Sequence, residues 1–156
     1  MFLQNNLGFF EFSIFKKFPE IVHGITTMKF GNMKLIPQDL KNPKVIFDEY
    51  QRIVKNLTNF SQKLGISRSN FATPQQIHSG RIKKIEFASS TKQSDYPFIV
   101  GSADRLVTNQ KGIFLFVAVA DCFPILAYDP VKKVIGIAHA GWRGLKAGIG
   151  KNLIQK

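Results

Sequence analysis

The sequence predicts an α/β protein in which helices flank a β-sheet. Three observations predict this class: an amphipathic pattern over residues 43–64, a series of extended apolar segments from residue 71 onward, and a second helical pattern from Leu145. The chain has 156 residues, which suits one domain and is short for two. We therefore expect a single domain over residues 1–156.

The first helix has clear start and stop signals. Asn42 is a good N-cap, Pro43 suits the first helical turn, and Gly65 suits a left-handed terminator. Between them, apolar or aromatic residues recur at steps of four and three, which places them on one helical face. These residues are Ile46, Tyr50, Ile53, Leu57, Phe60 and Leu64.

The remaining segments are mostly extended. Residues 9–15 and 21–28 predict short strands, and residues 31–43 predict a loop. Further strands are expected at 71–77, 81–87, 125–128 and 134–138. Residues 98–108 are expected to contain a short strand that is interrupted at 101–104. Residues 89–97 predict a loop. Residues 113–120 are apolar throughout and predict a strand buried on both faces. A single helix is expected from Leu145 onward.

Composition excludes several classes of protein. Apolar residues make up 44% of the chain and charged residues 21%, so extensive disorder is excluded. The net charge is +12, but only five of the 22 basic residues are Arg, which favours a solvated Lys-rich surface over a nucleic-acid interface. A positive field also suits a small anionic substrate. The longest apolar run is too short to span a membrane, and no secretory signal is recognisable, so we expect a cytoplasmic protein.

Three scarce residues stand at predicted strand ends. His78, Cys122 and His139 together form a normal three-ligand set for zinc that leaves a fourth position open. Each also has a structural alternative: a turn histidine, a small buried thiol and a hydrogen-bonded core histidine. A metal-free alternative uses Cys122 as nucleophile and His139 as base, in a thiol hydrolase or deamidase. The remaining histidine, His23, is predicted to be structural.

Other polar residues near these positions are candidates for substrate contact or proton transfer. Asp104 is a candidate general acid or base, with a turn-capping role slightly favoured, and Asp121 is a candidate for orienting a ligand. Arg143 is a candidate phosphate ligand or a surface ion-pair partner. Trp142 could stack on a base or pack structurally, and Gln76 could present its amide to a substrate.

Four ordered motifs resemble one family. They are QIHS at residues 76–79, GSADRLVT at 101–108, ADCFPIL at 120–126 and AHAGWRG at 138–144. Together they resemble the YfiH/laccase-domain family, also called the multicopper polyphenol oxidoreductase or purine nucleoside phosphorylase family. The resemblance implies a mixed sheet and one zinc ion held by His78, Cys122 and His139.

The resemblance also implies an activity. Members are described as purine nucleoside phosphorylases acting on adenosine, inosine and methylthioadenosine, and as adenosine deaminases. Purine nucleoside and phosphate are therefore the expected partners. Cys122, Asp104 and Arg143 are the expected catalytic residues, and Gln76, Arg143 and Trp142 the expected substrate contacts. Copper is a less favoured metal, because a laccase needs more histidines than the chain has.

Two departures from the family pattern accompany the resemblance. Met28 stands where an Arg is usual, and family members continue well beyond residue 156. The chain is therefore expected to be a truncated or split member that lacks the C-terminal part. An inactive fragment is the corresponding alternative to the enzyme.

Overall fold

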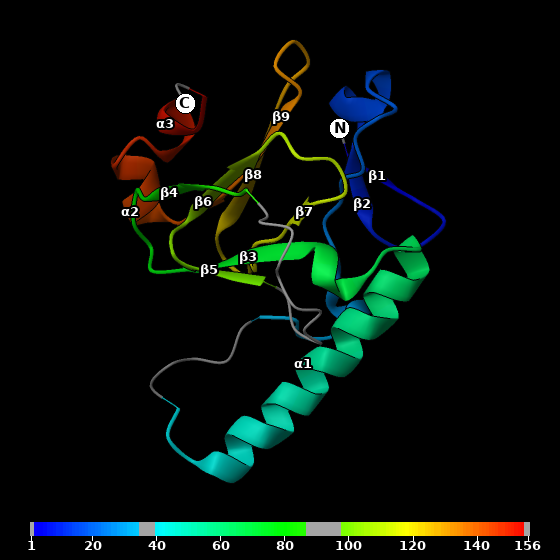
Figure 1. The fold of residues 1–156 in the computed structure, drawn as a ribbon, viewed down its shortest axis with the longest axis vertical. Coiled ribbons are helices and arrows are strands. Elements are labelled where there is room, and N and C mark those ends of the chain that lie inside the picture. Colours follow the sequence, from blue (N-terminus) through cyan, green and yellow to red (C-terminus); the bar gives the residue numbers. More distant parts are fainter. Residues whose placement is uncertain (1, 35–39, 87–97, 155–156) are drawn as a thin grey trace. The chain divides into compact units, whose positions relative to one another are not determined.

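The structure is a computed structural model that describes residues 2–34, 40–86 and 98–154 (Figure 1). The chain divides into two compact units, Met1–Ile66 and Ser67–Lys156. The expectation of a single domain stays a prediction. Within the described residues, no helix is both long and apolar enough to cross a membrane.

The first unit begins with a short antiparallel hairpin of β1 (Phe2–Gln4) and β2 (Phe10–Phe12). The predicted strand over residues 9–15 is only partly right, because a 3₁₀ helix, η1 (Ser13–Lys17), follows directly. The extended segment predicted at 21–28 makes one isolated bridge, from Ile25 to Phe10, and runs into η2 (Met28–Phe30). His23 is structural here, since its Nε2 accepts a hydrogen bond of 2.9 Å from the backbone of Phe12.

Helix α1 (Pro43–Leu64) has the predicted bounds. The Asn42 side chain accepts hydrogen bonds from the backbone N–H groups of Lys44 and Val45, and Gly65 ends the helix with φ of 67°. The buried face packs within the first unit, where the ring of Phe60 lies 5.5 Å from that of Phe30 between centroids. Both ends of this helix are set by local chemistry, which is why the sequence predicts them well.

The second unit contains two sheets, and it confirms the predicted α/β fold with a mixed sheet. The three-stranded sheet has the order β5-β3-β7 and is parallel, and the four-stranded sheet has the order β4-β6-β9-β8. In the latter, β4 and β6 are parallel while the other pairs are antiparallel. The strands are β3 (Phe71–Gln75), β4 (Ile82–Lys84), β5 (Phe98–Ser102), β6 (Arg105–Thr108), β7 (Phe114–Leu115), β8 (Phe123–Asp129) and β9 (Val134–Ala140), and η3 (Arg68–Asn70) precedes them.

Two strand predictions in this unit need correction. The strand expected over 113–120 is regular only in β7, because the backbone of Ala118 bonds with the side chain of Gln76 instead of a neighbouring strand. Conversely, the strand expected at 125–128 is longer, because β8 begins at Phe123 and includes Pro124. Proline is tolerated there because β8 is an edge strand. The loop expected at 89–97 lies outside the described residues.

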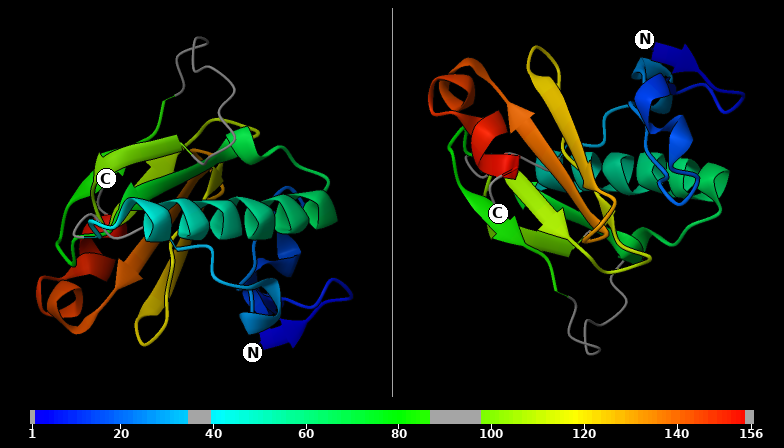
Figure 2. Two further views of the ribbon diagram at one scale, coloured as in Figure 1. Left: turned by 90° about the horizontal axis from the view of Figure 1, so that it is seen from below. Right: turned by 90° about the horizontal axis from the view of Figure 1, so that it is seen from above.

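The helix expected from Leu145 onward is two short helices, α2 (Trp142–Lys146) and α3 (Ile149–Ile154). Gly148 separates them with φ of 71°, a left-handed conformation that glycine adopts readily. Ile149 and Leu153 are buried in one cluster with Ala138 and Ala140 of β9. The views of Figure 2 show α3, in red, beside β9, in orange. This packing fixes the end of β9 that carries the candidate site.

Candidate metal centre

The three predicted metal ligands come from different segments and meet at one end of the second unit. His78 follows β3, Cys122 directly precedes β8, and His139 is the penultimate residue of β9. Because β8 and β9 are antiparallel, Pro124 lies opposite His139, which places Cys122 beside the end of β9. The two strands therefore bring thiol and imidazole together, and the loop after β3 supplies the second imidazole.

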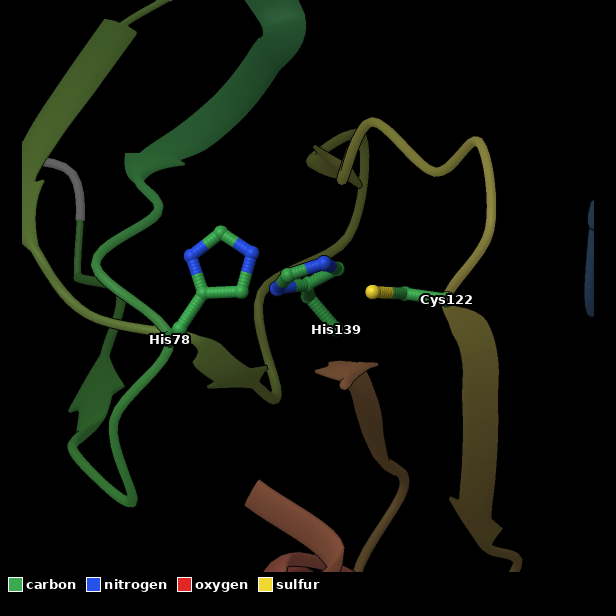
Figure 3. Close-up of side chains that lie close together, drawn as sticks. All are labelled: His78, Cys122 and His139. Atoms are coloured by element: carbon green, nitrogen blue, oxygen red, sulfur yellow. The ribbon is translucent and has the colours of Figure 1, made fainter. Parts of the chain in front are cut away.

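The ligand atoms of these side chains converge. One ligand atom from each of the three residues lies within 4.8 Å of the others. The two imidazole rings meet edge to face, with centroids 4.7 Å apart, and the Cys122 sulfur points toward the His139 ring (Figure 3). His139 is buried, Cys122 is half-buried and His78 is exposed, so the cluster opens to solvent on the His78 side.

This donor set suits a transition metal such as zinc. A thiolate and two imidazoles bind zinc at about 2.0–2.3 Å, which places ligand atoms of one tetrahedral ion roughly 3–4 Å apart. The observed separations need only small side-chain movements to reach that geometry. Three protein ligands leave a fourth position for water or substrate, as in catalytic zinc sites.

Asp104 links two of the ligands. Its Oδ1 accepts a hydrogen bond of 2.9 Å from the backbone N–H of His78 and lies 3.3 Å from Nδ1 of His139. Its Oδ2 accepts bonds from the backbone and hydroxyl of Ser79. The Asp104 side chain has no exposed surface. Asp104 thus caps the turn at His78 and Ser79, and its catalytic role stays a prediction.

A buried cation lies next to Asp104 in the sequence. Arg105 is only 4% exposed, and its Nη1 donates a bond of 3.3 Å to the carbonyl of Ile149 at the start of α3. Burial lowers the pKa of Arg105, and the charge of Asp104 opposes that shift. Arg105 thus ties the first turn of α3 to β6, while Asp104 holds the metal ligands.

Gly141 closes the cluster from the side of α2. A Cβ atom at this position would lie 3.2 Å from Sγ of Cys122 and 3.4 Å from Cδ2 of His78. The distance to Sγ is shorter than most Cβ contacts, and the distance to Cδ2 is at the lower limit of ordinary van der Waals contact. The absence of a Cβ at Gly141 therefore leaves space beside both side chains.

The predicted substrate residues lie in different environments. Trp142 and Arg143 form the exposed first turn of α2, directly after Gly141, and the Arg143 guanidinium lies 4.8 Å from the Trp142 ring centroid. Both ends of the Gln76 amide bond with the backbone of Ala118, at 2.8 Å each. Asp121 is exposed beside Cys122. Their substrate and ligand-orienting roles stay predictions.

Two residues beside the cluster, Ser79 and Gly141, were not predicted individually from the sequence. Ser79 donates two hydrogen bonds to Asp104, and Gly141 lacks the Cβ that would crowd Cys122 and His78. Each directly follows or closely follows a ligand within one of the motifs. Adjacency to a candidate ligand was therefore the available signal, although it did not specify the contact.

Comparison with known proteins supports the family resemblance that the four motifs indicated. Residues 22–156 match the family described as multi-copper polyphenol oxidoreductase laccase. The chain belongs to this family. Among curated members, the purine nucleoside phosphorylase YlmD of Bacillus subtilis is 29% identical over 88% of this chain and 50% of its own length. The human purine nucleoside phosphorylase LACC1 is 32% identical over 84% of this chain and 29% of its own length.

Further members of the laccase family bear on activity and fold. A prokaryotic protein named adenosine deaminase RL5 is 29% identical over 70% of this chain. The crystal structure of YfiH from Bacillus licheniformis superposes with a TM-score of 0.61 and 30% identity, covering 67% of this chain and 40% of that protein. The chain thus spans about half the length, or less, of the curated relatives it matches.

Proposed function

We propose that this chain carries the metal centre of a zinc-dependent purine nucleoside phosphorylase that also deaminates adenosine. The substrates we propose are adenosine, inosine and methylthioadenosine, together with phosphate. The observation that carries the proposal is the convergence of ligand atoms from His78, Cys122 and His139 within 4.8 Å. The names of the relatives support the nucleoside chemistry.

A bound zinc ion supplies Lewis acidity at this site. In phosphorolysis, a phosphate oxygen attacks the anomeric carbon of the ribose while the bond to the purine nitrogen breaks and the purine leaves with the electron pair. We propose that Arg143 binds and orients the phosphate, because it is exposed and lies two residues after Gly141, where an added Cβ would meet Cys122 and His78. Trp142, exposed beside it, is our candidate for stacking on the purine.

Deamination uses the same substrate with a different nucleophile. Water attacks C6 of adenine, and ammonia leaves with the proton that the water gives up. The cluster opens on its His78 side, because His78 is exposed while His139 is buried. We propose that the attacking oxygen, from phosphate in phosphorolysis or from water in deamination, lies on this open side of the cluster.

The test is metal content combined with product analysis on the purified chain. With adenosine and phosphate we expect adenine and ribose 1-phosphate, and without phosphate we expect inosine and ammonia. Cys122→Ala should lose both the metal and both reactions, whereas His23→Ala should retain them because His23 bonds within the first unit. Elemental analysis also separates zinc from copper.

Three results would contradict the proposal in different ways. Iodoacetamide-sensitive amide hydrolysis by a metal-free chain would identify the thiol hydrolase that the same Cys and His residues permit. Metal binding without nucleoside turnover would identify a fragment that needs a further chain or segment. Full activity in Cys122→Ala would remove the metal assignment altogether.

A further inference from the structure

We propose that Asp104 is the positioning residue of the metal centre, through which one buried carboxylate sets the geometry of both histidine ligands. The inference rests on the metal binding in the proposed function, and it does not depend on the nucleoside chemistry. It also replaces the general acid or base role that the sequence suggested for Asp104 with a role that acts through the ligands.

The first contact fixes which nitrogen of His139 faces the cluster. Oδ1 of Asp104 lies 3.3 Å from Nδ1 of His139, and a carboxylate oxygen that accepts a hydrogen bond there selects the imidazole tautomer with its proton on Nδ1. The lone pair then lies on Nε2, the nitrogen that remains free to bind a metal. The backbone adds to this alignment, since the N–H of His139 donates 2.8 Å to the carbonyl of Asp104.

The second contact holds His78 in an unusual backbone conformation. His78 has φ of 56°, in the left-handed region that a residue with a Cβ seldom adopts. The Asp104 carboxylate accepts the backbone N–H groups of both His78 and Ser79, which is the bonding that a tight turn of this kind leaves unpaired. The conformation that turns His78 toward Cys122 therefore depends on this carboxylate.

The burial of Asp104 argues against direct proton exchange with a substrate. Its side chain is fully buried and its two oxygens take four donors, two from the backbone, one hydroxyl and one imidazole. A buried carboxylate is retained where hydrogen bonds and a nearby positive charge compensate for its desolvation. Arg105 supplies one such charge, and a divalent ion held by His139 would add a second. A carboxylate bonded to a metal-binding histidine is the arrangement that orients such histidines in other proteins.

The experiment compares metal binding by the whole chain and its Asp104→Asn variant. Affinity for Zn²⁺ is measured by competition with a chromophoric chelator, and the Co²⁺ absorption spectrum reports ligand geometry. We expect Asp104→Asn to weaken zinc binding about 10- to 100-fold and to alter the cobalt spectrum. Nitrogen-15 NMR of the histidine rings should show His139 protonated at Nδ1 in the natural sequence, and this signature should be lost in the variant.

The matched control is Thr108→Val at the far end of β6, which removes a buried hydrogen bond of 2.9 Å to the carbonyl of Ile85 and the bond that the hydroxyl accepts from the N–H of Gln110. It should reduce stability without changing zinc affinity or the His139 signature. If Asp104→Asn does not fold, Ser79→Ala serves instead, because it removes one donor to Oδ2 and keeps the buried charge. We expect it to weaken zinc binding several-fold.

The outcomes separate the two proposals. If the natural chain does not bind zinc, both the metal assignment and the positioning role are overturned. If the natural chain binds zinc and Asp104→Asn binds it equally well, the positioning role alone is overturned. The positioning role is likewise overturned if Ser79→Ala, used in place of a variant that does not fold, keeps the affinity of the natural chain.

Discussion

At residue 141, a single added carbon would meet two candidate metal ligands at once. The distances from that carbon to Cys122 and His78 are 3.2 and 3.4 Å. The backbone at Gly141 has φ of −78° and ψ of 169°, values that alanine adopts without strain. The requirement for glycine at this position is therefore one of space beside the ligands and not of backbone conformation.

The variant Gly141→Ala should thus damage metal binding more than folding. We expect zinc affinity to fall about ten-fold, because the methyl group pushes Cys122 and His78 apart. The measurement is chelator competition alongside the melting temperature of the metal-free chain. Gly80→Ala is the control, since a Cβ there meets other atoms only at 3.8 Å. Equal zinc affinity in both variants would show that the contact at Gly141 has no consequence.

The sequence predicted the identity of the candidate ligands but not the support around them. Three histidines and one cysteine leave few combinations, and strand-end positions singled out His78, Cys122 and His139. In contrast, the hydrogen bond between the His139 imidazole and the Asp104 carboxylate joins positions 35 residues apart, and no local pattern encodes it. Its prediction would have required the register of β6 against β9.

Among the elements, the β8–β9 hairpin positions two of the ligands, and its turn is held by Asp129. The carboxylate accepts hydrogen bonds of 2.9 Å from the backbone N–H groups of Lys132 and Val131. The bond from Lys132 is the main reason that the pKa of Asp129 lies below its ordinary value of 3.8. The ionised form therefore favours the folded turn.

This shift predicts a pH-dependent contribution to stability. A lowered folded-state pKa means that the contribution is present above about 3.8 and is lost as the pH falls through the folded-state pKa. Asp129→Asn keeps an acceptor and removes the charge, so the natural chain should melt higher than this variant at neutral pH, and the gap should close in acid. Melting temperatures across the acid range test this.

The control for that titration is Asp129→Ala, which removes both the charge and the acceptor. Its melting temperature relative to Asp129→Asn should not depend on pH, because neither side chain titrates. A gap between the natural chain and Asp129→Asn that stays constant in acid would show that the charge contributes nothing to the turn.

Elements differ in how far the sequence specified them. Both ends of α1 were predicted because caps act within a few residues of the helix. The strand expected over 113–120 was wrong beyond Leu115, because a strand exists only where a partner pairs with it. The apolar composition of this segment indicated burial and not strand pairing. At Ala118 the backbone N–H and carbonyl bond with the Gln76 side chain instead of a neighbouring strand.

For the molecule as a whole, a metal bound by three distant segments should stabilise the folded state. The ligands span residues 78 to 139 and converge only in the folded chain. Zinc at 100 times its dissociation constant would add about 2.7 kcal/mol, or roughly 5–10 °C in melting temperature for a chain of this size. Thermal unfolding with zinc and with a chelator measures this shift.

The zinc-induced shift should be absent in Cys122→Ala and preserved in His23→Ala. The second variant removes an imidazole from the first unit, where its Nε2 bonds with Phe12. This variant therefore tests whether a histidine outside the cluster contributes to the stabilisation by zinc. An equal shift in all three proteins would indicate binding elsewhere on the surface.

We also expect the β8–β9 hairpin to determine the order in which the three candidate ligands come together as the chain folds. Cys122 and His139 flank a local antiparallel pairing whose turn lies at residues 129–133, and hairpins of this kind close in about 1–10 μs. We expect His78 to join them only after the more distant pairing of β6 with β9 has formed, because closing a longer loop is slower. We therefore expect a newly made chain to bring two of the candidate ligands together first and to add the third once the tertiary structure has formed.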